Sequence, residues 1–325
     1  METKDFVLGF AAGKSSGVKS VYAFIDATYP AGVICTATKG GIVITAPDTS
    51  GHFVFTIPEA GTWVISADGI EETVVISSYG QSETVELKYI TIVPWSTGTD
   101  AQIAAMVAAL DNGDISITET GWQIGDERIV RLAAMEATGV GETHAEQDVT
   151  LVLMDSQHYD FVGGGKDHFV VGLKHLLNEE GYMNSSSTNN GSWNGCARRS
   201  WCNNVFRAAI PEVLRACFKQ FQCVTAESYN GSTNKISNDY FSLFAEQEIF
   251  GSRTYSNTTE AAALTQIEWY KTPTNRIKRR SGSAAEWWDR SPSGSYNSFC
   301  TVYSNGETST GDAKVARGLA PFGCI

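Results

Sequence analysis

The sequence predicts an α+β protein of two domains, an all-β sandwich followed by a larger domain that mixes helices and strands. With 325 residues, the chain is long enough for about two domains of roughly 100 to 200 residues each. Up to about residue 90 it has the pattern of short strands separated by turns, and from Gly121 onward helical and strand patterns are mixed. We therefore expect a sandwich over 1–90, a linker and helix over 91–120, and the mixed domain over 121–325.

Alternating apolar residues mark the strands of the first domain. Phe53, Phe55 and Ile57 alternate with other residues, so three large side chains fall on one face of a strand and can enter a core. Further strands are expected from Trp63 and Ile65 onward, at Thr73–Ile76 and at Thr84–Leu87, with turns at Asp48–Gly51, Pro58–Gly61 and Asp68–Gly69.

One amphipathic helix is expected between the domains. Pro94–Gly98 has the composition of a linker, and Thr99 with Gln102 forms a Thr-x-x-Gln capping box. Asn112-Gly113 supplies the stop. The apolar stripe indicates packing onto the next domain rather than a seam for a partner helix, and it consists of Ile103, Met106, Val107 and Leu110.

The second domain contains both the alternation typical of strands and the periodicity typical of helices. Ile129–Met135 and Asp148–Met154 alternate like strands, whereas His168–Asn178 and Trp201–Cys217 have helical patterns. Pro211 interrupts the latter, which predicts two helices or a kink there. The segment Gly181–Gly195, rich in Asn, Ser and Gly, is expected to be a surface loop.

The charge balance limits the partners of the chain. A formal net charge of -12 leaves no overall surface for neutralising phosphates, so we expect no nucleic-acid partner. The basic cluster at Arg276–Arg280 is expected to be a solvated loop. The acidic segment Met1–Asp5 does not resemble a signal peptide, and no stretch reaches the roughly 18 apolar residues of a membrane span.

The seven cysteines form no regular even framework, so we expect them to be mostly reduced and buried. Cys196 with Cys202 and Cys217 with Cys223 repeat a six-residue step, but zinc ligand pairs normally lie two to four residues apart. No metal site is therefore predicted.

Four C-terminal segments resemble a known family of domains. They are Trp193–Phe206, Glu246–Gly251, Trp287–Pro292 and Gly318–Ile325. Together they look like a family of uncharacterised domains that is frequent in phage and prophage genomes of gut bacteria and is distantly similar to the C-type-lectin-like fold. The resemblance covers roughly residues 115–325 and implies a C-type-lectin-like α+β domain.

The departures from the family pattern are few. Family members carry Leu where this chain has Asp289, and the terminus Ala320–Ile325 is one residue shorter before its final Cys-Ile. We expect these changes to affect surface details and not the fold. In the first domain, Asp48–Phe53 and Pro58–Trp63 resemble immunoglobulin-like modules related to carboxypeptidase regulatory domains, which serve as spacers and adaptors.

The tryptophan-rich segment is expected to form the core of the second domain, because its large side chains would bury much area and a neighbouring arginine would be stacked or paired. The expected core residues are Trp287, Trp288, Arg290, Phe299 and Phe322.

A candidate ligand-binding face follows at Tyr296–Thr310, where tyrosine and asparagine occur on a loop-rich stretch. In related lectin-like phage proteins this end of the fold displays the target-binding surface. The alternative is that these are ordinary turns of a scaffold that contacts other virion subunits. The candidate residues are Tyr296, Asn297, Tyr303 and Asn305.

The sequence predicts no catalytic residue and no cofactor. The chain has no Gly-x-Ser-x-Gly, and Gly163–Asp167 lacks the Ser or Thr of a phosphate loop, so it is expected to be a turn. His144-x-Glu146 lacks the Pro-Cys-x-x-Cys of zinc deaminases, and Glu179-Glu180 has the pattern of a solvated helix end.

One enzymatic alternative comes from resemblance. The formylglycine-generating sulfatase modifiers share a lectin-like fold and use cysteine to bind copper, and Cys300 with Cys324 could form such a pair. The terminal Cys-Ile, however, belongs to the non-enzymatic family pattern.

The resemblance implies a non-catalytic bacteriophage virion protein of the tail, baseplate or head, located in the virion. Its expected partners are other virion proteins, a glycan or protein of the host surface, and further copies of itself. A bacterial surface adhesin is the alternative outside the enzymes, and the N-terminal residues 1–30 argue against it because they lack a secretion signal.

Overall fold

The structure, a computed structural model, describes residues 23–29, 32–46, 51–87 and 90–325. The chain forms two compact units that divide between Ile90 and Thr91. It is an α+β protein in which strands dominate, since 36% of the described residues are in strands and 19% in helices. The predicted N-terminal features and most of the predicted turn at Asp48–Gly51 lie outside the described residues. Within the described part of the chain, no helix is long and apolar enough to cross a membrane.

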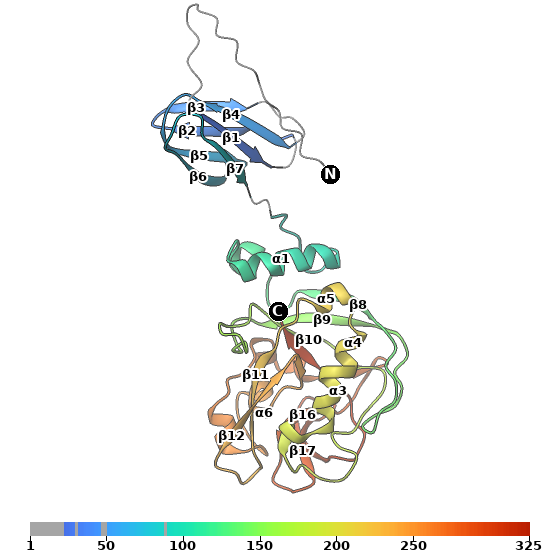
Figure 1. The fold of residues 1–325 in the computed structure, drawn as a ribbon. Helices are drawn as coiled ribbons and strands as arrows, with labels where there is room; N and C mark the ends of the chain where they lie inside the picture. The colour runs from blue at the N-terminus through green and yellow to red at the C-terminus, as the bar shows by residue number, and fades with distance from the viewer. Residues whose placement is uncertain (1–22, 30–31, 47–50, 88–89) are drawn as a thin grey trace, which may run out of the picture. The chain divides into compact units, whose positions relative to one another are not determined.

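The first unit contains a three-stranded sheet of order β4-β1-β7 and a four-stranded sheet of order β3-β2-β5-β6 (Figure 1). The predicted alternation is confirmed, because Phe53, Phe55 and Ile57 are fully buried. Asp68 and Gly69 both have positive φ (50° and 83°), as a tight two-residue hairpin turn requires. The strands are β1 (Ala23–Thr28), β2 (Cys35–Lys39), β3 (Ile42–Ala46), β4 (His52–Ile57), β5 (Gly61–Ala67), β6 (Ile70–Ile76) and β7 (Ser82–Glu86).

Helix α1 (Asp100–Asn112) opens the second unit with the predicted caps. The Gln102 backbone N–H donates to Thr99 Oγ1 (3.3 Å), and the Thr99 N–H donates to Gln102 Oε1 (2.9 Å). Gly113 ends the helix in the left-handed conformation. The apolar stripe is buried in the core of the second unit.

The linker prediction at Pro94–Gly98 is wrong for its tryptophan. Trp95 is fully buried in the second core, where its ring lies 5.3 Å from that of Trp122, and its carbonyl accepts a hydrogen bond from Arg128. A proline and a glycine around one aromatic residue gave a turn-like composition, but the size of the indole favours its burial.

The second unit is organised around a five-stranded antiparallel sheet of order β13-β19-β10-β9-β8. The C-terminal segment forms β19 inside this sheet, paired with both β10 and β13. A three-stranded sheet β16-β17-β18 and two hairpins complete the unit. The strands are β8 (Glu127–Leu132), β9 (Gln147–Asp155), β10 (Val170–Leu173), β11 (Phe221–Ala226), β12 (Asn234–Asp239), β13 (Phe241–Ser242), β14 (Arg279–Arg280), β15 (Ser283–Ala284), β16 (Trp287–Pro292), β17 (Ser298–Val302), β18 (Thr308–Asp312) and β19 (Phe322–Cys324).

The helices that follow α1 are short, and several succeed one another in the α3–α5 region (Figure 1). The helical stretch predicted at Trp201–Cys217 is confirmed, with a break at Ile210–Pro211. The elements are α2 (Ser192–Gly195), α3 (Ala197–Trp201), the π-helical turn η2 (Cys202–Phe206), α4 (Arg207–Ala209), α5 (Glu212–Arg215), α6 (Glu246–Phe250), α7 (Thr258–Ala262), and the 3-10 turns η1 (Thr118–Thr120), η3 (Glu268–Lys271) and η4 (Pro273–Arg276).

Two further segments differ from the prediction. The helix predicted at His168–Asn178 is wrong: Val170–Leu173 is strand β10, buried along its whole length. A continuous apolar run of this length has no decisive periodicity, and pairing with β9 and β19 makes it a strand. The predicted loop at Gly181–Gly195 contains α2 and buries Met183 and Trp193.

Candidate functional site

A pocket of about 390 Å³ lies where three loops of the second unit meet. Two of the loops are the turns that join β11 to β12 and β16 to β17, and the third is the segment before α2. We call it the tyrosine pocket; amide, hydroxyl and aromatic groups line it. The lining residues are Thr188, Asn189, Asn190, Ser228, Tyr229, Asn230, Ser293, Gly294, Ser295 and Tyr296.

The buried side chain of Asn189 fixes the first wall of the pocket. Its Nδ2 donates to the carbonyls of Ser295 (2.7 Å) and Ser298 (2.8 Å), and its backbone N–H donates to the Tyr296 carbonyl (2.9 Å). Asn189 thereby fixes the turn between β16 and β17, because its amide group satisfies backbone carbonyls of that turn. The turn presents the Tyr296 ring, which is 82% exposed.

A second buried asparagine, Asn257, fixes the opposite wall. Its Nδ2 donates to the carbonyls of Ser228 (3.0 Å), Tyr229 and Gly231 (2.8 Å), so the turn between β11 and β12 is tied down. The Oδ1 of the same side chain accepts the Thr259 N–H (2.6 Å) and thereby caps helix α7. Both walls are therefore set before any ligand arrives.

Tyr229 and Gly294 form a close contact between these walls. A Cβ placed on Gly294 would lie 3.1 Å from Cζ of Tyr229, so a side chain there would push the ring away. The half-buried Tyr229 and the exposed Tyr296 give the pocket two aromatic rings beside several amides. Such rings pack against apolar faces, while amides and hydroxyls hydrogen-bond to polar edges.

The four predicted ligand-binding residues do not form one surface. Tyr296 and Asn297 precede β17, whereas Tyr303 and Asn305 follow it, so five residues, or roughly 16 Å, separate the two pairs. Of the four, Tyr296 lines the tyrosine pocket. Asn297 donates instead to Asp312 Oδ2 (2.7 Å).

The second pair belongs to a turn. Asn305 donates to Glu307 Oε2 (2.9 Å) and accepts the Glu307 N–H (3.1 Å), which closes the turn before β18. Tyr229 and the asparagines of the pocket were missed. The composition of Ser228–Gly231 is typical of a turn and could have drawn attention to Tyr229 and Asn230, but it does not reveal which strands the turn joins.

The predicted core residues of the second domain are fully buried, and Arg290 is paired. Its guanidinium binds Glu248 with two hydrogen bonds of 2.6 and 2.9 Å and donates to the Leu243 and Val224 carbonyls and to Thr225 Oγ1. Burial opposes ionisation of Glu248, but Arg290 outweighs it and holds the pKa of that carboxyl below its usual value. Neither residue of the pair lines the tyrosine pocket.

The expectation that Asp289 changes only surface details is wrong, because Asp289 is fully buried. Its Oδ1 accepts the Ser291 N–H (2.8 Å). Burial and the nearby Glu246 raise the pKa of Asp289 well above its usual value, and burial raises the pKa of Glu260 to about 7. Strand β16, which carries Asp289, is buried at every position. A strand covered on both faces has no alternation of buried and exposed residues, so the sequence pattern could not reveal the burial of Asp289.

The basic cluster is not a wholly solvated loop, because Lys278 is fully buried. Its Nζ donates to the carbonyls of Leu173 and Lys174 and lies 5.6 Å from the Tyr270 ring centroid and 5.2 Å from that of Trp287. Burial lowers the pKa of Lys278 to about 7. Apolar neighbours from distant segments create this environment.

All seven cysteines are free in this structure, and all are buried, as the sequence predicts. Cys300 lies on β17 and Cys324 on β19, strands of different sheets. Burial raises the pKa of both thiols well above the usual value, which opposes the thiolate that a metal ligand requires. The predicted turn at Gly163–Asp167 is confirmed by positive φ at Gly164 and Gly165.

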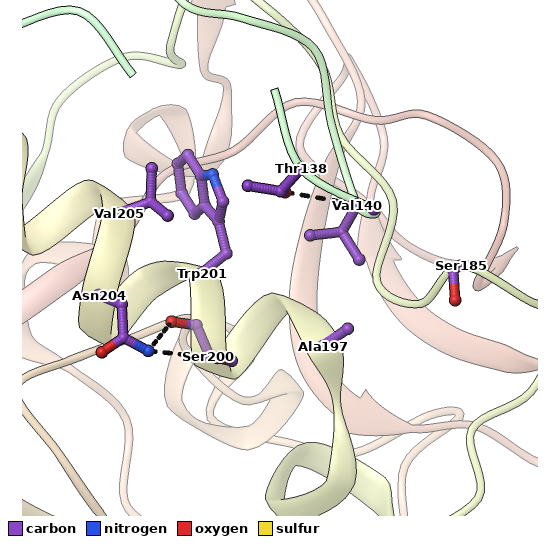
Figure 2. Close-up of a pocket in the computed structure, with 9 residues that line it drawn as sticks. Thr138, Val140, Ser185, Ala197, Ser200, Trp201, Asn204 and Val205 are labelled. Atoms are coloured by element: carbon purple, nitrogen blue, oxygen red, sulfur yellow. Dashed lines mark hydrogen bonds between the residues drawn. The ribbon is translucent and has the colours of Figure 1, made fainter. Parts of the chain in front are cut away.

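A smaller cavity of about 230 Å³ lies beside α3 (Figure 2). Figure 2 shows Trp201 and Val205 on the helical side and Thr138 and Val140 on the facing segment. The His144 ring lies 5.6 Å from the Trp201 ring and is tilted by 41° against it. Burial lowers the pKa of His144 to about 4, so it is neutral at pH 7. The lining is mostly apolar.

Residues 150–325, more than half of the chain, match the family described as a domain of unknown function, DUF6273, and the chain belongs to that family. No curated protein matches this chain. A similar solved structure is that of a protein from Bacteroides uniformis to which carbohydrate binding has been provisionally ascribed. It shares 8% identity and a TM-score of 0.18, and the match covers 48% of this chain and 63% of that protein.

Proposed function

We propose that this chain is a non-catalytic binding protein whose second unit recognises a glycan through the tyrosine pocket. The observation that carries the proposal is the lining: two tyrosine rings and several amide and hydroxyl groups on walls held by Asn189 and Asn257. A sugar ring offers an apolar C–H face for an aromatic ring and hydroxyls for amides. Walls fixed in advance lower the entropic cost of ordering them on binding.

The finer fold assignment belongs to this proposal. We propose that the second unit is C-type-lectin-like and that the first unit is an immunoglobulin-like spacer. The paired sheets β4-β1-β7 and β3-β2-β5-β6 support the latter. The pairing of the C-terminal strand β19 inside the main sheet supports the assignment of the second unit. In this proposal, the loops at the ends of β11 and β16 are the ones that display the binding site.

The proposed setting is a bacteriophage virion, in its tail, baseplate or head. The support is the resemblance of Trp287–Pro292 and Gly318–Ile325 to a domain family of phages and prophages. In that setting the glycan belongs to the host surface, and neighbouring virion proteins and further copies of the chain are the other partners. Immunogold labelling of purified virions tests the location, and unlabelled virions would count against it.

Tyrosine substitutions test the glycan-binding proposal. The full chain is applied to a glycan array, and the strongest hit is titrated against Tyr229→Ala, Tyr296→Ala and the control Tyr303→Ala. Tyr303 is also exposed, but it lies at the other end of β17. We expect each pocket substitution to weaken binding about 10-fold, since a lost ring contact of this kind corresponds to about 1.4 kcal/mol. The control should bind like the native chain.

Two results would overturn the assignment. The first is a chain that binds no glycan on the array while its thermal unfolding shows that it is folded. The second is equal weakening by Tyr303→Ala, which would move recognition to the other end of the strand.

A further inference from the structure

A second polar pocket, of about 470 Å³, is lined in part by Arg207. The guanidinium carbon of Arg207 lies 3.5 Å from the ring centroid of Tyr240, so the two groups stack. Arg207 Nε is buried and has no hydrogen-bond acceptor among the described residues. No ion pair of Arg207 is present within the described part of the chain either.

The arginine is held in place by the local fold. The π-helical turn η2 precedes it, and the Arg207 N–H donates to the Cys202 carbonyl, five residues back. Asn203 on that turn accepts the Tyr240 N–H (2.6 Å) and donates to the Phe241 carbonyl (3.1 Å). The helix carrying Arg207 and the chain carrying Tyr240 are therefore fixed to each other.

The other groups around Arg207 are mainly amides. Arg199 also lines the pocket, but it pairs with the buried Asp239 at 2.6 Å, so its charge is compensated. Arg207, which forms no ion pair within the described residues, therefore gives this pocket a local positive charge, although the chain as a whole has a formal net charge of -12. The amides that line the pocket come from Asn194, Asn203, Asn204, Gln220 and Asn238.

We propose that this pocket binds the oxyanion group of an acidic saccharide, with the Arg207 guanidinium as its partner. A guanidinium presents a planar fork that matches a carboxylate, and stacking on Tyr240 holds that fork. The side-chain amides of Asn194, Gln220 and Asn238 provide donors and acceptors for hydroxyl groups. The oxyanion site follows from the geometry alone, whereas the saccharide part of the assignment rests on the proposed function.

The site is separate from the tyrosine pocket. Asn238 pairs with Gln222 near the base of the β11–β12 hairpin, and Tyr229 lies in the turn beyond Asn234 at its other end. From Asn234 to Asn238 the strand spans four residue steps, roughly 13 Å. The two pockets share no lining residue, so Arg207 and Tyr296 can be substituted separately.

The experiment compares three probes by NMR titration of the full chain. Methyl glucuronide carries both a carboxylate and hydroxyls, methyl glucoside lacks the carboxylate, and acetate lacks the hydroxyls. We expect the glucuronide to bind at least 10-fold more tightly than either of the others, and less tightly as salt rises. Arg207→Gln should lose at least 10-fold, and Arg207→Lys should lose an intermediate factor because lysine lacks the fork.

Controls separate the possible results. Arg279→Gln removes the same charge at an exposed site and should bind like the native chain. Thermal unfolding of Arg207→Gln verifies its fold. Equal binding of glucuronide, glucoside and acetate, or undiminished binding by a folded Arg207→Gln, would overturn the site. Glucuronide binding lost in Tyr296→Ala but kept in Arg207→Gln would overturn it while supporting the tyrosine pocket.

Discussion

Charged side chains in the interior of the second unit are accommodated in two ways. Arg290 and Glu248 are fully buried and satisfy each other, with the remaining guanidinium donors bonded to carbonyls and a hydroxyl. Lys278 is equally buried, but among the described residues it contacts carbonyls and rings and no carboxylate. Burial without a counter-charge disfavours the cation, so the protonation of Lys278 is coupled to folding.

This coupling predicts a pH-dependent stability. Burial lowers the pKa of Lys278 from 10.5 to about 7. Between these values the unfolded chain binds the extra proton, so the lysine makes the free energy of unfolding rise with pH. Lys278→Met should remove this contribution. The variant-minus-native difference in unfolding free energy, from urea titrations, should therefore fall by about 2 kcal/mol between pH 7 and pH 8.5.

The cysteines also titrate near this range in the unfolded chain, but they are common to both proteins and cancel in the difference. Lys314→Met, at an exposed lysine, serves as the control and should show no such change. A variant-minus-native difference that is constant with pH would contradict a neutral amine in the folded chain.

Residue identity alone could not reveal these environments. Asp289 and Lys278 are polar, and sequence patterns place polar residues on the surface; both are buried because strands and rings from distant segments cover them. Trp287, Trp288 and Phe322 were assigned to the core correctly because large aromatic area favours burial whatever the topology.

At the scale of elements, helix α1 tests how far local signals determine structure. Its capping box satisfies N–H groups that the helix leaves open. Thr99→Ala should lower the free energy of unfolding of the second unit by about 1 kcal/mol, measured by urea denaturation, whereas Thr99→Ser should change it little. Equal loss in both variants would mean that the methyl group, rather than the hydroxyl, matters.

Elements with local signals were predictable, and those set by long-range pairing were not. The alternation at Phe53–Ile57 identified strand β4, and Pro211 identified the helix break. The short apolar run at β10 became a strand through its partners β9 and β19. The tyrosine pocket follows the same division: Tyr296 was identified as a loop residue of recognition type, but only pairing of β11 with β12 brings Tyr229 to it.

At the scale of the whole molecule, the chain has two separate hydrophobic cores, one with Phe55 and Trp63 and the other with Trp95 and Trp287. Because cooperativity follows shared packing, we expect two transitions in calorimetry of the full chain. Phe55→Ala should destabilise one unit by about 3–5 kcal/mol through the cavity it leaves, and so lower one transition temperature while the other stays constant. The surface substitution Val54→Thr on the same strand should shift neither by a comparable amount, since Val54 is half exposed. A single transition, or both shifting together with Phe55→Ala, would show that the units unfold as one.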